Sequence, residues 1–258
     1  MAEAEKPKIK VLMLADFLCA TGFAQVAHNI AWQLHASGKY EITIVAINYY
    51  GDPYDSLKFP FRIYPAVHAG IQRYSDLHGR QRWLDMVGRL QYDIVFAIQD
   101  SFILKDVIQP LIARRPTVAS NRKFVCIVYY PIDAQPDEEW LNKGVLPADF
   151  PVTYTKYAYE QSKSVVPKLQ HLRYIYHGVD PKDFYPMSKD KRIELKRQFL
   201  SRLPNAPKDA FVFMNINRNQ HRKDIFSTLK AFSIVKKRKP NAFLYLHMQA
   251  SDSGGNLF

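Results

Sequence analysis

Short apolar runs alternate with amphipathic stretches along the first two thirds of the chain. The first run, residues 9–15, leads into a loop with a single glycine. Residues 23–35 then carry apolar side chains at three- and four-residue intervals, which predicts a helix. A second apolar run follows at residues 41–47. Strand, short loop, helix and strand form a βαβ unit, and nearly continuous apolar strands are typical of a parallel sheet buried on both faces.

The same alternation continues to residue 176. It predicts further strands at residues 61–66, 92–98, 123–130, 152–155 and 172–176. It predicts helices between them at residues 74–90, 102–113 and 157–166. The fold class expected for this part of the chain is therefore α/β, with a doubly wound parallel sheet.

The pattern changes after His177, where prolines flank a polar helix predicted at residues 189–200. The first βαβ unit of a second domain is then predicted at residues 210–216, 224–237 and 242–247. We expect a first domain at residues 1–185, a linker at 186–207 and the start of a second domain at 208–258. Because a doubly wound domain usually needs ~100 residues or more, we expect the second domain to be truncated.

The composition is that of a soluble globular protein. Hydrophobic residues make up 47% of the chain and charged residues 23%, and 16 Phe, 16 Tyr and 3 Trp supply surface to bury, which excludes disorder for most of it. Cys19 and Cys126 stand in apolar runs and cannot form a disulfide framework, which points to a reducing compartment. No apolar run approaches the ~20 residues of a membrane span, and the N-terminus has no signal-peptide core, so we expect a cytoplasmic protein.

Positive charge is concentrated in one segment of the sequence. The chain has a net charge of +12, and between Pro181 and Pro240 there are 16 Lys and Arg against 5 Asp and Glu. A basic segment of this kind attracts the phosphates of nucleotides, nucleic acids or anionic lipids. It would also allow peripheral contact with a membrane surface. The alternative is a solvated helix face and a linker.

Candidate binding residues stand where predicted strands end, because doubly wound sheets bind ligands at the carboxyl ends of their strands. Thr21 and Gly22 open the first helix, whose free N–H groups favour an anion such as a diphosphate. The alternative is that Thr21 only caps the helix. His177, Gly178 and Asp180 close the last strand of the first domain, where we expect a hinge or one side of a cleft.

Candidate catalytic residues follow two of the buried strands. Tyr130 and Asp133 come at the end of the strand at residues 123–130, and Asp100 ends the strand before it. A carboxylate at this edge of the sheet can orient an acceptor hydroxyl or act as a base. The alternative for each Asp is a turn residue.

The loop after the strand at residues 210–216 holds three cations and opens onto a helix. Arg218 and Lys223 flank it, with Asn219 between them, and both cations can reach a phosphate at the helix N-terminus. Cations at a helix N-terminus oppose the helix dipole unless an anion is present. We therefore predict a phosphate site here rather than a solvated basic turn.

The sequence shows no spacing of His, Cys and carboxylates that is typical of a metal site. It also lacks the GxSxG, Walker and GxGxxG patterns. We expect neither a metal nor a cofactor.

Three segments together resemble a known family. TGFAQVAHNIAWQL follows the first strand, HGVDPKDFYP closes the first domain, and NRNQHRKD follows the first strand of the second. This combination resembles glycosyltransferases of the GT-B fold, which have two facing Rossmann-like domains, and within them glycosyl transferase family 4 (group 1). The family's HGVDxxxFxP pattern is matched by His177, Gly178, Val179, Asp180, Phe184 and Pro186. The segments RNQxRKD and LYLH resemble a phage and prokaryotic branch of this family.

The resemblance also extends to the basic loop. Family 4 enzymes typically carry GRxxxxKG there, and Arg218 and Lys223 match its Arg and Lys, while Asn217 and Asp224 replace both glycines. In the family this pair holds the diphosphate of a nucleotide-sugar donor such as a UDP- or GDP-sugar. The resemblance covers the whole chain, which lacks the family's later acidic motif.

The resemblance implies a metal-independent, retaining transfer of a sugar to an acceptor held by the first domain. The family often places a histidine near the reacting sugar where YYPID stands, so Asp133 or Tyr130 would take its place. Three classes of acceptor fit the sequence: a glycan, a lipid-linked sugar and a modified base in phage DNA. Two other hypotheses are a non-catalytic binding module and a dinucleotide-dependent oxidoreductase, of which the latter lacks its glycine pattern.

Overall fold

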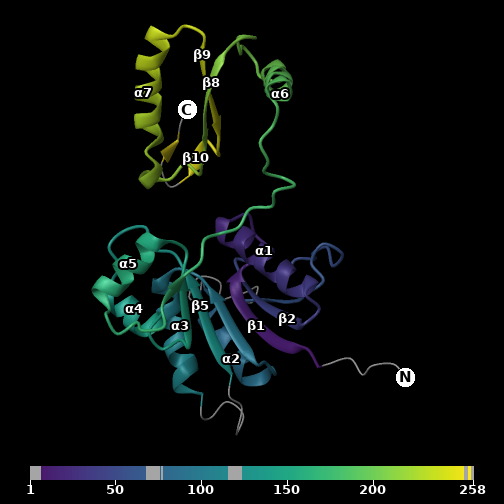
Figure 1. Cartoon of the computed structure of the whole chain (residues 1–258), viewed down its shortest axis with the longest axis vertical. Coiled ribbons are helices and arrows are strands. Elements are labelled where there is room, and N and C mark those ends of the chain that lie inside the picture. The colour runs from purple at the N-terminus through teal and green to yellow at the C-terminus, as the bar shows by residue number, and fades with distance from the viewer. Residues whose placement is uncertain (1–6, 68–75, 77, 116–123, 253–254, 257–258) are drawn as a thin grey trace. The chain divides into compact units, whose positions relative to one another are not determined.

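The computed structural model describes residues 7–67, 76, 78–115, 124–252 and 255–256. The chain forms two compact units, Met1–Gly178 and Val179–Phe258, which are described separately (Figure 1). The division falls after Gly178, and the domain bounds 1–185, 186–207 and 208–258 stay a prediction. Within the described ranges, no helix is both long and apolar enough to cross a membrane.

The first unit is built on a parallel sheet. Its strands are β1 (Ile9–Asp16), β2 (Tyr40–Ile47), β3 (Arg62–Pro65), β4 (Ile94–Ile98), β5 (Val125–Tyr130), β6 (Phe150–Thr153) and β7 (Arg173–Tyr174). Their order across the sheet is β3-β2-β1-β4-β5-β6-β7, and every neighbouring pair is parallel. The order reverses between β1 and β4, which is the topological switch point of a doubly wound sheet. The expected fold class is confirmed.

Helices cover both faces of this sheet (Figure 1). They are α1 (Gly22–Ala36), α2 (Arg80–Arg89), α3 (Ser101–Ala113), α4 (Glu138–Gly144) and α5 (Lys156–Val165). Helix α1 buries Ala27 and Ala31 against β1 and β2 on one face. The other helices pack on the opposite face, where Trp83 of α2 and Leu104 of α3 are fully buried.

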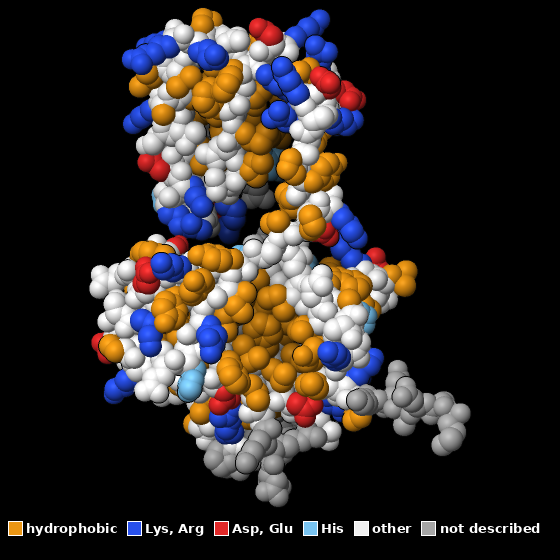
Figure 2. Space-filling model, in the orientation of Figure 1, with side chains coloured by type: hydrophobic (Ala, Val, Ile, Leu, Met, Phe, Trp, Pro, Cys, Tyr) orange, Lys and Arg blue, Asp and Glu red, His pale blue; other side chains and the backbone are white. Residues whose placement is uncertain are grey.

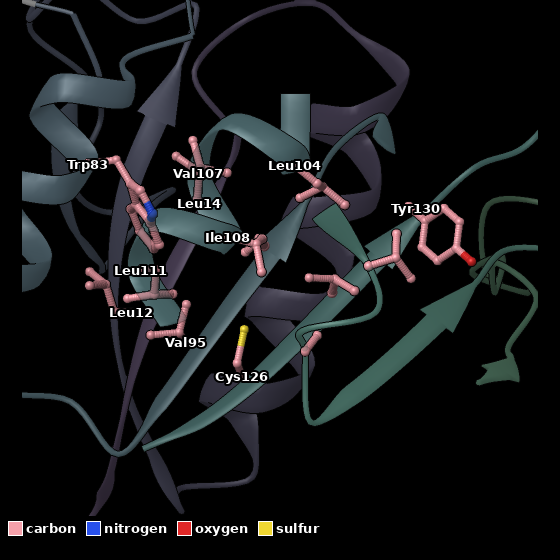
Figure 3. Close-up of a cluster of buried hydrophobic side chains, with 14 of the residues drawn as sticks. Leu12, Leu14, Trp83, Val95, Leu104, Val107, Ile108, Leu111, Cys126 and Tyr130 are labelled. Atoms are coloured by element: carbon pink, nitrogen blue, oxygen red, sulfur yellow. The ribbon is translucent and has the colours of Figure 1, made fainter. Parts of the chain in front are cut away.

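The core beneath α2 and α3 is drawn in Figure 3. Leu104, Val107, Ile108 and Leu111 recur at three- and four-residue intervals along α3 and are fully buried, as the apolar periodicity predicts. Helix α4 packs against α3 so closely that a Cβ on Gly144 would lie 2.6 Å from the backbone nitrogen of Lys105. Only glycine fits there without displacing the α3 backbone.

On the α1 face, the sheet beyond the helix keeps an exposed apolar strip. Phe96 of β4 and Ile127 of β5 are only half-buried, and Val125 and Phe150 are 36% and 52% exposed. Figure 2 shows the apolar side chains gathered on this face of the first unit. Strands β5 and β6 thus carry apolar residues on both faces, although helices cover only one face of this part of the sheet.

The second unit has a smaller parallel sheet. Its elements are α6 (Lys189–Ser201), β8 (Phe211–Ile216), the 3-10 turn η2 (His221–Lys223), α7 (Ile225–Arg238), β9 (Ala242–His247), β10 (Ser251–Asp252) and β11 (Gly255–Asn256). Strands β8 and β9 pair in parallel and α7 connects them, so this is the expected βαβ unit. Phe213 of β8 packs on Phe232 of α7, with ring centroids 5.9 Å apart. Phe199 of α6 packs on Tyr245 of β9 at 5.0 Å.

The predicted elements agree with the structure except at a few places. Helix α4 and the short β10–β11 hairpin were not predicted. The helix predicted at residues 74–90 begins only at Arg80, because Gly79 has a positive φ of 69° and Asp76 accepts hydrogen bonds from the first N–H groups of α2. Residues 74, 75 and 77 of that prediction, and residue 123 of the strand predicted at 123–130, lie outside the described residues.

Candidate active site

A cluster of polar side chains occupies the switch point of the first sheet. Asp16, which ends β1, is only 4% exposed and accepts three hydrogen bonds. Thr21 Oγ1 donates to its Oδ2 at 2.7 Å, and Gln99 Nε2 and Asn48 Nδ2 donate to its Oδ1 at 2.9 and 3.3 Å. We call these four residues the switch-point cluster. Each follows or ends one of the neighbouring strands β1, β2 and β4, and the parallel pairing therefore brings them together.

Local backbone geometry holds the cluster in place. Thr21 is the N-cap of α1, and its hydroxyl accepts a hydrogen bond from the Ala24 N–H at 3.1 Å while it donates to Asp16. Asn48 turns the chain sharply after β2, with a positive φ of 58° that Asn tolerates better than most residues. A Cβ on Gly22 would meet nothing within 4 Å, so the backbone beside the cluster is open to a ligand.

The charge of the switch-point cluster changes the interpretation of Thr21 and Gly22. We predicted a diphosphate at this helix N-terminus. The Asp16 carboxylate, held by Thr21 itself, already places negative charge there, and a diphosphate would be repelled by it. A neutral hydroxyl group, which can donate to the carboxylate and accept from an N–H, suits this turn better.

Tyrosine and histidine rings lie next to the switch point. Tyr154, just after β6, contacts Tyr129 with the rings tilted and His177 edge to face, with ring centroids 4.2 Å apart in both pairs. The Tyr129 hydroxyl donates to the carbonyl oxygen of Ile175 at 2.6 Å and lies 3.0 Å from His177 Nδ1. His177 is thereby tied to β5 at the end of the first unit. Burial lowers the pKa of His177, which favours its neutral form.

The Tyr154 hydroxyl is buried and has no hydrogen-bond partner among the described residues. Burial raises the pKa of this phenol, and the nearby charges of Asp100 and Asp16 add to the effect. Its proton is therefore held at neutral pH. Sequence analysis missed Tyr154, although it stands in the strand predicted at residues 152–155.

The predicted catalytic residues fall in different surroundings. Asp100 is half-buried at the N-terminus of α3, next to the switch-point cluster, and its N–H donates to Gln99 Oε1 at 3.1 Å. Asp133 lies in an exposed bend after β5. Gly178 and Asp180 are exposed, and Asp180 begins a turn by accepting a hydrogen bond from the Lys182 N–H at 2.8 Å.

A catalytic role for Tyr130 does not fit its position. Its side chain is fully buried, in the core cluster that also contains Leu104 and Cys126 (Figure 3). Its hydroxyl donates to Ser162 Oγ of α5 at 2.9 Å. Side chains alternate between the faces of a strand, so Tyr129, one residue earlier, points to the face that carries Tyr154 and His177. The tyrosine near the site is Tyr129.

The second candidate group lies in the second unit, in the loop between β8 and α7. Arg218 is exposed, and its Nε and Nη2 donate to Asp252 of β10 at 3.0 Å each. Lys223, half-buried at the end of η2, has no ion pair within the described part of the chain. The bidentate pair of Arg218 with Asp252 uses one edge of the guanidinium and leaves the Nη1 N–H groups available to a ligand.

Asn219 has a structural role in this unit. It is 1% exposed, and its Nδ2 donates to the carbonyl oxygens of Ala250 and Gly255 at 3.0 and 2.9 Å. These contacts tie the loop after β8 to the β10–β11 hairpin. The amide nitrogen is thus already engaged within the second unit.

Asp224 supplies the negative charge at the N-terminus of α7 that the helix dipole favours. We expected an external anion at the N-terminus of α7, but the Asp224 carboxylate caps it by accepting from the Ser227 N–H at 3.2 Å. Hydrogen bonds with the Ser227 side chain and with the Ser227 N–H lower the pKa of Asp224. Its φ of 42° lies in the left-handed region, which glycine adopts more readily than Asp.

Within the described ranges, no group of three His, Cys, Asp or Glu side chains lies close enough to hold a metal ion. Metal independence stays a prediction, since it concerns the reaction rather than this arrangement.

Comparison with known proteins places the fold. No known family matches the chain, and no curated protein does. Among solved structures, the crystal structure of Anabaena Alr3699/HepE in complex with UDP and glucose matches over 93% of this chain and 69% of its own, with a TM-score of 0.53 and 11% sequence identity. The likeness shows a GT-B-like fold.

Proposed function

We propose that this chain transfers a sugar from a nucleotide-diphosphate sugar to an acceptor hydroxyl. The observation that carries the proposal is the arrangement of Arg218 and Lys223 in the loop between β8 and α7, with Arg218 held by Asp252. Two cations at the carboxyl end of a parallel strand suit a diphosphate, because Arg gives a fixed fork of donors and Lys a mobile point charge.

The chemistry requires such a pair. When the bond between the sugar and the diphosphate breaks, negative charge develops on the leaving phosphate oxygens. Preorganised cations stabilise that charge and so lower the barrier. Arg218 is preorganised by its two hydrogen bonds to Asp252, and Lys223 by the short η2 turn.

The first unit supplies groups suited to an acceptor. Asp16 and Asp100 offer carboxylate oxygens at the switch point, and Tyr154 offers a protonated hydroxyl without a partner. A sugar hydroxyl both donates and accepts hydrogen bonds, so it can lie between a carboxylate and a phenol. We assign Asp16 and Tyr154 to orienting the acceptor and Asp100 to accepting its proton.

The comparison supports the donor class. HepE was solved with UDP and glucose, and a shared fold favours, but does not determine, a UDP-sugar donor. The family 4 assignment, and with it retention of the anomeric configuration and independence of metal, rests on the sequence motifs around Arg218 and His177.

A narrower candidate is a transferase that acts on modified bases in DNA. It is favoured by the exposed cations of α6, among them Lys189, Arg192 and Arg197, in the most basic segment of the chain. Phosphate contacts dominate non-specific DNA affinity and weaken steeply with salt. Duplex binding that does not fall between about 50 and 200 mM salt would remove this candidate.

The test of the main proposal is calorimetric titration of the chain with UDP, GDP and ADP. We expect a double substitution, Arg218→Ala with Lys223→Ala, to abolish measurable binding of the preferred nucleotide. The matched control is Lys237→Ala with Arg238→Ala, which removes the same charge from exposed positions at the other end of α7. Equal affinity in the two double variants would refute the assignment of Arg218 and Lys223.

A further inference from the structure

A cleft of about 430 Å³ opens beside the switch-point cluster in the first unit. The loop that leads into α1 forms one wall, through Phe17, Cys19 and Ala20. The loop after β2 forms the other, through Asn48, Tyr49 and Tyr54. Asn48 belongs to both sites, since it lines the cleft and donates to Asp16. The cleft and the proposed acceptor site thus share Asn48.

Aromatic rings supply most of the walls of this cleft. Phe17 and Phe59 meet edge to face with centroids 5.5 Å apart, and His28 lies 4.8 Å from Phe59. Tyr49 and Tyr54 meet edge to face at 6.3 Å on the opposite wall. Contacts between the rings fix them in place, which provides a rigid surface for another flat ring.

The polar atoms of the walls are largely engaged already. The Tyr49 hydroxyl donates to the Asp52 carbonyl oxygen at 2.6 Å, and the Tyr54 hydroxyl donates to that of Phe61 at 3.2 Å. His28 Nε2 lies 2.5 Å from the carbonyl oxygen of Phe17. A bare sugar, with a hydroxyl on nearly every carbon, would find few partners in such a cleft.

The cleft is also nearly uncharged. Burial lowers the pKa of His28 and raises that of the Cys19 thiol, so both are neutral at pH 7. Of the described residues that line the cleft, only Asp52 carries a charge, and it is negative. No Lys or Arg is among the described lining residues, although Lys58 lies close by, with its Nζ 5.3 Å from the centroid of the Phe59 ring. A phosphate group in the cleft would meet the negative charge of Asp52 and no lining cation.

We propose that this cleft binds a neutral aromatic ring that forms part of the acceptor. The inference rests on the proposed function, because a ring bound in the cleft belongs to an acceptor only if a hydroxyl attached to it reaches Asp16, past Asn48. Ring stacking provides the affinity, and the switch-point cluster selects the hydroxyl. The substrate class is an aryl glycoside or a similar hydroxylated aromatic compound.

The first test uses the unmodified chain with 4-nitrophenyl β-D-glucopyranoside and methyl β-D-glucopyranoside, which share the sugar and differ in the ring. Cys19 lines the cleft and is half-buried, while Cys126 is fully buried. We expect the nitrophenyl glucoside to slow alkylation of Cys19 by iodoacetamide at least about tenfold at saturation, measured by mass spectrometry, and the methyl glucoside to leave it unchanged. Equal protection by both, or by neither, would overturn the proposal.

The second test fills the cleft. Ala20 is exposed and lines it, so Ala20→Trp should weaken binding of the nitrophenyl glucoside about tenfold or more in a titration. Ala36→Trp, at the exposed end of α1, is the matched control and should bind normally. Unchanged binding in Ala20→Trp would refute the site. Neither test uses a nucleotide, so a failure here is separate from a failure of the donor site at Arg218.

Discussion

Arg218 and Asp252 stand 34 residues apart in the sequence and join the basic loop to the β10–β11 hairpin through two hydrogen bonds of 3.0 Å. The Asp252 side chain is only 12% exposed, whereas that of Arg218 is 68% exposed. The carboxylate is therefore the fixed partner and the guanidinium the accessible one. This arrangement orients the remaining N–H groups of Arg218 for a ligand.

We predict that Asp252→Asn weakens UDP binding by up to about tenfold, because an ion pair with one exposed partner contributes on the order of 1 kcal/mol to holding that partner in place. Calorimetric titration measures the change. The control is Glu194→Gln, which removes the ion pair with Lys191 on α6 and should leave UDP affinity unchanged. Tighter binding in Asp252→Asn would show instead that Asp252 competes with the nucleotide.

Tyr130 provides a test that separates a core residue from a catalytic one. Tyr130→Phe removes the hydrogen bond to Ser162 and leaves the Ser162 hydroxyl buried without its donor. We expect the free energy of unfolding to fall by about 1 kcal/mol in urea denaturation, with donor binding and transfer rate per folded molecule unchanged. Ser162→Ala should cost a similar amount. A large loss of rate without loss of stability would restore Tyr130 as a catalytic residue.

Asp16 should be the most sensitive carboxylate of the first unit. Asp16→Ala leaves the donors of Thr21 and Gln99 buried or half-buried without an acceptor, and we expect a loss of about 1–3 kcal/mol in the free energy of unfolding. The control is Asp133→Ala, an exposed position, which should change stability by less than about 0.5 kcal/mol. Equal stability of the two variants would show that the switch-point cluster contributes nothing to folding.

Most of the architecture followed from local patterns in the sequence. The strands and longer helices of the first unit show a regular spacing of apolar residues that can be recognised from each segment alone. Helix α3 is an example, with its buried positions 104, 107, 108 and 111. Helix α4 has only seven residues, too few for a helical period to be recognised. Where an element is short, tertiary contacts such as that between Gly144 and α3 decide its structure.

The site was harder to predict because its contacts join distant residues. Asp16 looks like the polar end of an apolar run until Asn48 and Gln99, 32 and 83 residues away, are placed beside it. Tyr129 and Tyr130 are adjacent, and β5 is apolar on both faces, so the sequence pattern could not show which tyrosine lies on which face. Register decides this, and register depends on the whole sheet.

Asp224 combines two roles that substitutions can separate. Its carboxylate caps α7, and its backbone adopts the left-handed region. We expect Asp224→Ala to destabilise the second unit, since it loses the cap and keeps the strain, and Asp224→Gly to destabilise it clearly less. Thermal unfolding followed by circular dichroism measures both. The order of the two variants is the test, and a more stable Ala variant would contradict the geometry at this position.

Acid sensitivity of the first unit should depend on Asp149. Its carboxylate accepts hydrogen bonds from Arg115 and from the Cys126 N–H, which link the end of α3 to β5. Partial burial acts to raise the pKa of Asp149, but these hydrogen bonds and the Arg115 charge outweigh it and hold the pKa below its ordinary value of 3.8. The unfolded chain therefore takes up the proton at a higher pH than the folded one. It follows that the stabilisation is present above the unfolded value and is lost as the pH falls through the folded one.

We predict that Asp149→Asn unfolds more easily than the parent chain between about pH 5 and pH 7, by no more than about 1 kcal/mol because the side chain is 36% exposed. The difference should narrow as the pH falls below about 4, where the parent carboxylate begins to take up a proton. Urea denaturation at each pH measures it. Asp85→Asn is the control, because it removes an exposed i,i+4 pair with Arg89 and should give a small difference. A gap between Asp149→Asn and the parent chain that widens in acid would mean that the folded state binds the proton more readily than the unfolded one, contrary to the contacts seen around Asp149.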